Sequence, residues 1–231
     1  MKRIRFVIAL VVVLVLGCLA LACFRAREPR YQGRTLSEWI EDGDKAYNNF
    51  IGDPNNNPFH PETDPAWQAA RVGVQKIGRD AIPFLVRWAQ AKDSTLKVKV
   101  MDWFDEHSAF HFKIKPAYYY QNKAYFGFRL LESESKPSWP VLFEWASSTN
   151  LERRPWAFAC LAGINPDKET FLPVLIRFVH DPDNNIQVFA AKVFKDRYPR
   201  DAKAAGVYEL FPFLKDVPTN ESIPTILQPN K

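Results

Sequence analysis

Histidines four residues apart are the first residues of this sequence that suggest chemistry. On a continuous helix, His107 and His111 would lie on one face, as two ligands of a metal ion must. The segment between them, HSAFH, lacks the glutamate that directly follows the first histidine in the HExxH motif of zinc proteases. His60, in a segment rich in Asn and Pro, is a third candidate ligand. A metal-dependent enzyme using these histidines is therefore the alternative hypothesis.

Other catalytic signatures are missing from the sequence. No serine lies in a nucleophile-elbow pattern, and no glycine cluster resembles a phosphate-binding loop. Cys160 lies in an alanine-rich segment typical of a buried helix. We therefore predict a protein that is not an enzyme and that needs no cofactor.

A group of tyrosines offers a different chemistry, the recognition of another protein. Tyr118, Tyr119 and Tyr120 are consecutive, so they cannot all face one core, and Tyr125 follows closely. Aromatic side chains are common anchors of protein interfaces. These four tyrosines are the predicted partner-binding residues. In the alternative reading, they fill the gap that an insertion leaves between two helical repeats.

The elements that must position these residues begin with an apolar segment. Residues 6–24 contain no charged residue and no amide, and a helix of this length would span roughly 28 Å, close to the hydrocarbon thickness of a bilayer. We predict an uncleaved signal anchor that crosses the bacterial inner membrane once, with the body outside the cytoplasm. The alternatives are a cleaved signal peptide and a lipoprotein acylated at Cys23 or Cys18, each of which ends a loose processing motif.

The basic net charge of +5 belongs to this terminal segment. Residues 1–30 contain six basic residues and one acidic residue, so basic and acidic residues balance in the rest of the chain. Because nucleic-acid binding depends on neutralising phosphates, a neutral body predicts no nucleic-acid partner.

The body carries a repeated helical motif. Residues 82–88, 139–145 and 172–178 share the pattern apolar, Pro, apolar, Leu, apolar, charged, aromatic. Proline is well tolerated in the first turn of a helix, and a single charge in an apolar helix should face water. Segments with small residues precede each copy, which predicts antiparallel helix pairs. A fourth pair is predicted over residues 186–198 and 202 to about 215, and Asp183 or Asn184 can cap its first helix.

Three segments resemble the HEAT repeat family in its short bacterial form. Residues 181–194 resemble the first helix of such a repeat, with its DPD turn and alanine pair, and residues 70–85 resemble the turn and second helix. Residues 31–39 are similar to the leader of such repeats in exported proteins of verrucomicrobial and related bacteria. The arginine that often follows the DPD turn is Gln187 here. The resemblance implies an all-α, armadillo-like α-solenoid.

This organisation divides the chain into four parts. They are a signal anchor or signal peptide (1–30), a capping helix with an Asn/Pro-rich loop (31–64), HEAT-like repeats with an insertion at about 93–120 (65–216), and a disordered tail (217–231). The predicted function is a membrane-tethered scaffold for protein–protein interaction with an unidentified protein partner. A helper of chromophore-attaching lyases is a further alternative, because related short repeats occur in such enzymes.

Overall fold

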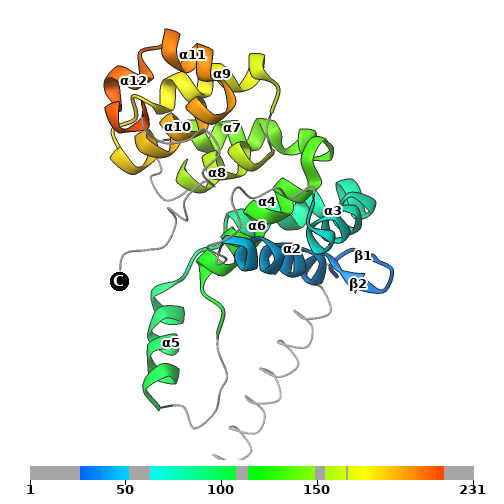
Figure 1. Ribbon diagram of the computed structural model, residues 1–231. Coiled ribbons are helices and arrows are strands. Elements are labelled where there is room, and N and C mark those ends of the chain that lie inside the picture. Colours follow the sequence, from blue (N-terminus) through cyan, green and yellow to red (C-terminus); the bar gives the residue numbers. More distant parts are fainter. Residues whose placement is uncertain (1–26, 52–62, 108–113, 149–153, 165, 216–231) are drawn as a thin grey trace, which may run out of the picture.

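The computed structural model describes residues 27–51, 63–107, 114–148, 154–164 and 166–215, and these are mostly helical (Figure 1). This confirms the predicted all-α class. The α-helices are α2 (Leu36–Ile51), α3 (Pro65–Ile77), α4 (Ile82–Ala89), α5 (Thr95–His107), α6 (Ala117–Leu131), α7 (Trp139–Ser147), α8 (Arg154–Ile164), α9 (Lys168–Phe178), α10 (Asn184–Arg197), α11 (Pro199–Ala204) and α12 (Val207–Leu210). The 3₁₀ helices are η1 (Gly78–Ala81), η2 (Glu132–Ser138) and η3 (Pro212–Lys215).

A short β-ribbon precedes the first helix and was not predicted. Strands β1 (Arg30–Tyr31) and β2 (Arg34–Thr35) pair antiparallel, with Arg30 opposite Thr35. The two residues between them, Gln32 and Gly33, have φ angles of 50° and 76°, as a tight hairpin turn requires. Strands of two residues are too short to show the alternation by which a strand is identified in a sequence.

The predicted capping helix is present as α2. Its start is a capping box, in which the Glu38 carboxylate accepts hydrogen bonds from the backbone N–H of Thr35 at 2.6 Å and from its hydroxyl at 2.9 Å. The Glu38 N–H donates in return to Thr35 Oγ1 at 3.3 Å. Trp39 and Ile40 are buried, as predicted for residues that cover the first helix pair.

The repeated apolar–Pro motif lies in α4, α7 and α9, and the predicted exposure of its charged residue is confirmed, although its prolines and Ile176 are exposed as well. The leucine in each copy is fully buried, the aromatic residue is buried and the charged residue is exposed. The leucines are Leu85, Leu142 and Leu175, the aromatic residues Trp88, Trp145 and Phe178, and the charged residues Arg87, Glu144 and Arg177.

The third copy of the motif differs in one respect. Pro83 and Pro140 lie in the first turn of their helices, whereas Pro173 lies inside α9. The expectation that every proline starts a helix was therefore wrong for α9. This helix begins earlier because the Asp167 carboxylate accepts a hydrogen bond from the N–H of Thr170 and caps it.

Glycines in α3 and α6 permit close helix packing, but with other partners than predicted: they approach α2 and α4, which precede them, and not the motif helices α4 and α7 that follow. A Cβ atom at Gly73 in α3 would lie 2.3 Å from Cδ2 of Trp39 in α2. A Cβ atom at Gly127 in α6 would lie 2.3 Å from Cδ2 of Leu85 in α4. Both distances are far below a normal carbon contact, so only glycine fits at either position.

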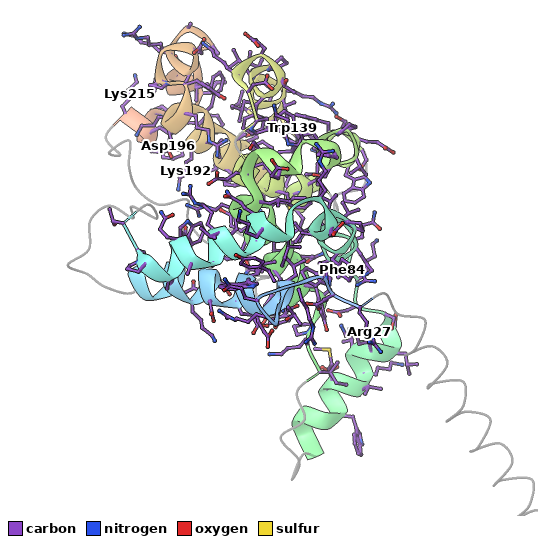
Figure 2. The ribbon with its side chains drawn as sticks, turned by 90° about the vertical axis from the view of Figure 1, so that its right-hand side faces the viewer. Arg27, Phe84, Trp139, Lys192, Asp196 and Lys215 are labelled. Atoms are coloured by element: carbon purple, nitrogen blue, oxygen red, sulfur yellow. The ribbon has the colours of Figure 1, made fainter. Side chains whose placement is uncertain are left out.

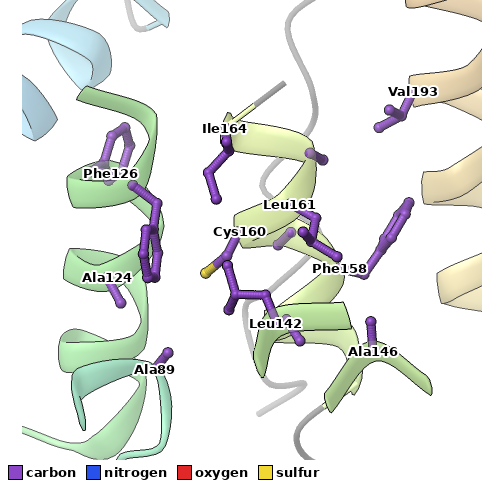
Figure 3. Packing of buried hydrophobic residues seen from close by; sticks show 14 of the residues in the cluster. Ala89, Ala124, Phe126, Leu142, Ala146, Phe158, Cys160, Leu161, Ile164 and Val193 are labelled. Carbon is purple, nitrogen blue, oxygen red and sulfur yellow. The ribbon is translucent and has the colours of Figure 1, made fainter. Parts of the chain in front are cut away.

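Helices follow one another in space roughly in chain order. Helices α2, α3, α4 and α6 pack together at one end, α9 to α12 lie at the other, and α7 and α8 lie between them (Figure 1). Helix α8 contributes much of the central core, where Phe158, Cys160 and Leu161 are fully buried. Figure 3 shows these residues between Phe126 of α6 and Val193 of α10.

Two predicted boundaries need correction. Helix α6 starts at Ala117, so the tyrosines assigned to the end of the insertion form its first turn. A single helix expected over residues 202–215 is instead α11, α12 and η3, because Gly206 adopts a left-handed conformation with φ of 72° that interrupts it. The neighbouring α10 is capped by Asp183, as predicted.

Among the described residues, no helix combines the length and the apolar character that a bilayer-spanning segment needs. The predicted anchor at residues 6–24, with Cys18 and Cys23, lies outside this part of the chain, as does the predicted tail at 217–231.

Candidate functional site

A pocket of about 470 Å³ opens where α3 and α6 meet α7 and α8. We call it the Arg129 pocket. Helices α3, α6, α7 and α8, the 3₁₀ helix η2 and the start of α9 contribute to it. The lining residues are Trp67, Arg129, Glu132, Ser133, Lys136, Trp139, Gly163, Ile164 and Asp167.

Arg129 is held by aromatic rings on its α3 and α2 side. The centre of its guanidinium lies 5.0 Å from the ring centroid of Trp67 and 4.9 Å from that of Tyr47. A cation over an aromatic face at this distance is electrostatically favourable. Burial raises the pKa of Tyr47, while a hydrogen bond with Arg129 opposes that rise. The hydroxyl of Tyr47 therefore stays protonated at neutral pH.

A second arginine lies behind Arg129, on α10. The Arg197 guanidinium donates a hydrogen bond to the backbone oxygen of Ala162. Burial lowers the pKa of Arg197 to about 10, and the positive charge of Arg129 contributes to this shift. Arg197 is therefore still charged at neutral pH, although it does not itself line the pocket.

Glu132 forms the acidic side of the rim. It follows the last residue of α6 with a φ of 51°, which turns its side chain toward α3. Its carboxylate accepts hydrogen bonds from Arg71 and Gln75, both at 3.2 Å. The positive φ is energetically unfavourable for a residue with a Cβ, and these two contacts help to hold it.

Trp139 and Lys136 form the opposite wall. The indole N–H of Trp139 donates to the Ser135 hydroxyl at 3.3 Å, which fixes the ring. The Lys136 ammonium lies 5.8 Å from the Trp139 ring centroid. Ser133, at the rim, is exposed. The wall is thus a fixed aromatic ring with an adjustable cation beside it.

Small and acidic residues complete the pocket on the α8 and α9 side. Gly163 lets the Tyr125 ring lie close to α8, because a Cβ atom at this position would lie only 3.3 Å from that ring. Asp167 accepts hydrogen bonds from the N–H and the hydroxyl of Thr170, and these bonds lower its pKa. Charges of both signs therefore surround an aromatic interior.

The structure does not bring the four predicted tyrosines together as one patch. Tyr118 is about half exposed, whereas Tyr120 packs edge-on against Tyr119, with 5.3 Å between their ring centroids. Tyr125 lies against Gly163 behind the Arg129 pocket. Whether any of them binds a partner stays a prediction.

Tyr119 belongs to a charged cluster that links α2 to α6. Its hydroxyl donates to Glu41 at 2.5 Å, and the buried ammonium of Lys123 donates to the same oxygen at 2.7 Å. Burial acts to raise the pKa of Glu41 and to lower that of Lys123, but the hydrogen bonds within the cluster outweigh it. The pKa of Glu41 is therefore lowered and that of Lys123 raised, so both groups are charged over a wide pH range.

Most of the candidate histidines and cysteines lie outside the described residues. His107 ends α5, while His60, His111, Cys18 and Cys23 lie outside the described residues. Within the described ranges, no group of three or more His, Cys, Asp or Glu side chains is placed to hold a metal ion. Cys160 is fully buried, and burial raises the pKa of its thiol far above the ordinary value.

The Arg129 pocket was not predicted from the sequence. Trp67, Arg129 and Trp139 are far apart along the chain, and only the packing of α3, α6 and α7 brings them together. One signal available in the sequence was the polar segment 132–138, which separates the apolar end of α6 from the apolar α7.

Comparisons with family models, with curated proteins and with solved structures gave no match to this chain. The resemblance to HEAT repeats therefore stays a prediction.

Proposed function

We propose that this protein is a membrane-tethered, non-catalytic scaffold of HEAT-like helical repeats that binds a segment of another protein in the Arg129 pocket. The observation that carries the proposal is the pocket itself, in which two tryptophans and an arginine line a space bordered by both acidic and basic side chains.

The lining residues suit a peptide ligand. Trp and Arg are the residue types most enriched among the energetic anchors of protein interfaces. Trp67 and Trp139 offer apolar surface for a side chain, while Arg129, Lys136, Glu132 and Asp167 can bind the polar groups and charges of a peptide. A rim with both signs of charge favours a ligand with both signs of charge.

The order of helix packing supports a repeat scaffold. Helix α2 packs on α3, α4 on α6, α7 on α8, and α9 on α10, so most contacts join elements that are close in the sequence. Repeat proteins have this property because each unit mainly contacts its neighbours. Such proteins commonly bind partners along an extended surface made by several repeats.

The tether in this proposal is the apolar segment 6–24 of the sequence. The full chain should stay in the membrane pellet after extraction with alkaline carbonate. Leu14→Arg, which puts a charge in the centre of this segment, should release it, because a central arginine costs about 2.5–3.5 kcal/mol or more on insertion. Release of the unaltered chain would contradict the tether.

Site-specific photo-crosslinking tests partner binding. A photoreactive amino acid at Ser133, on the rim of the Arg129 pocket, should capture a discrete partner band in cells that produce the full chain. The same group at Ser147, which is exposed at the end of α7 and does not line the pocket, is the matched control. Equal capture at both positions, or capture only at Ser147, would contradict the proposed site.

A further inference from the structure

Helix α5 exposes large apolar side chains in an unusual concentration. Leu96, Val98 and Trp103 are 72%, 42% and 56% exposed, and they make up three of the eight strongly exposed large hydrophobic residues in the described part of the chain. In Figure 1, α5 stands away from the other helices. Exposed apolar surface grouped in this way is typical of a site that contacts a partner or a membrane.

Leu96 and Trp103 share one face of α5. They are seven residues apart, or about two helical turns, which places them roughly 10 Å apart along the same side. Val100 lies between them on that side and is partly exposed. Lys99 is exposed at the edge of this face, and its long side chain can extend beyond the apolar residues.

The position of α5 relative to Arg27 suggests what covers this face. Arg27 is the first residue that the structure describes, and Figure 2 places it at the end of the molecule from which α5 projects. In Figure 1, α11 and α12 lie at the opposite end from α5. Only two residues, Arg25 and Ala26, lie between Arg27 and Phe24, the last residue of the apolar segment, so Arg27 is three residues along the chain from Phe24. Three residues span at most about 11 Å. If residues 6–24 cross a bilayer, this end of the body must lie at the membrane surface.

We infer that α5 lies in the interfacial layer of that membrane, with Leu96, Val100 and Trp103 directed toward the acyl chains. The inference rests on the membrane tether of the proposed function. A helix of this kind lies in the plane of the interface with its apolar side in the lipid. Tryptophan is enriched at this depth, and Lys99 beside the apolar face can reach anionic headgroups. The body is then held at two points, by the anchor and by α5.

Spin-label accessibility in the full chain tests this arrangement. Single nitroxide labels at Leu96→Cys and Trp103→Cys are compared with Leu210→Cys, an equally exposed apolar residue in α12 at the opposite end. A label at Val12→Cys reports on the anchor. Cys18 and Cys23 are replaced by alanine, and Cys160 stays because it is fully buried. The chain is reconstituted in nanodiscs of phosphatidylethanolamine and phosphatidylglycerol.

The ratio of oxygen to nickel-chelate accessibility separates the outcomes. We expect the labels at residues 12, 96 and 103 to favour oxygen several-fold over the label at residue 210. A lipid-like signal at residue 12 with water-like signals at 96 and 103 would overturn the inference and leave the tether standing. A water-like signal at residue 12 would overturn both. Dipolar broadening between labels at residue 96, with a water-like ratio, would assign the face to a second copy of the chain and overturn the inference.

Discussion

The guanidinium of Arg154 in α8 donates a hydrogen bond to the carboxylate of Asp181, in the turn before α10, and both side chains are buried. The other oxygen of Asp181 accepts the N–H of Asp183 at 2.9 Å, and its backbone oxygen accepts a hydrogen bond from Gln187. This pair therefore joins two successive helix pairs. The arginine expected after the DPD turn is missing from that position, and Arg154 supplies the charge from the preceding unit instead.

Breaking this pair should destabilise the chain strongly. Arg154→Met leaves the Asp181 carboxylate buried without its cation, and removing one partner of a buried pair costs about 3–5 kcal/mol. Thermal unfolding, followed by circular dichroism, should therefore begin at a clearly lower temperature. Arg79→Met is the matched control because Arg79 is exposed. If both variants unfold like the wild type, Arg154 has no structural role.

Stability should fall at acid pH through the Glu41–Lys123 pair. The folded-state pKa of Glu41 is lowered, so its contribution is present above the ordinary pKa of a glutamate and disappears as the pH falls through the folded value. Glu41→Gln should thus be less stable than the wild type near about pH 7, and the difference should shrink as the pH falls below the ordinary pKa of a glutamate. Urea unfolding at neutral pH and at a series of acid pH values measures this difference. If the difference in the free energy of unfolding between Glu41→Gln and the wild type does not change with pH, the charge of Glu41 does not contribute to stability.

The close approach of α2 and α3 predicts that Gly73 cannot be enlarged. Gly73→Ala would drive a methyl group into the buried Trp39 ring, and such overpacking costs about 1–3 kcal/mol, partly offset by the roughly 0.5–1 kcal/mol gained when alanine replaces a helical glycine. Gly163→Ala, whose nearest neighbour would lie at 3.3 Å, should be near neutral. Chemical denaturation of the two variants compares them directly. If Gly73→Ala is the more stable of the two variants, the Trp39 ring does not pack against Gly73 as described.

The helices and their buried faces follow from short-range patterns, and so they could be predicted. The Pro-containing motif places Leu85, Leu142 and Leu175 at one position of a helical turn, and that period alone identifies them as core. The Thr35–Glu38 capping box is likewise a local signal. The break at Gly206 was missed because a single glycine within an apolar segment fits either a continuous helix or a left-handed end.

The Arg129 pocket depends on contacts between residues far apart in the chain. In the sequence, Arg129 looks like an ordinary exposed charge on a helix. Only the packing of α2 and α3 brings Tyr47 and Trp67 close to its guanidinium. In the sequence, Glu132 likewise looks like an acidic residue on the surface, and only the fold places Arg71 and Gln75 within hydrogen-bond distance of its carboxylate. The tyrosines were predicted as a patch from their spacing alone. Helix α6 instead directs Tyr119 toward Glu41 and Tyr125 toward Gly163.

The affinity of the captured partner for the Arg129 pocket tests the central claim most directly. Ser133→Trp would place an indole at the rim, and since Ser133 is exposed the fold should be unaffected. Ser147→Trp makes the same change outside the pocket. Calorimetric titration of the full chain with the partner segment should give at least about a tenfold weaker affinity for Ser133→Trp, a loss of about 1.4 kcal/mol, and no change for Ser147→Trp. Equal affinities for the wild type and Ser133→Trp would contradict binding in this pocket.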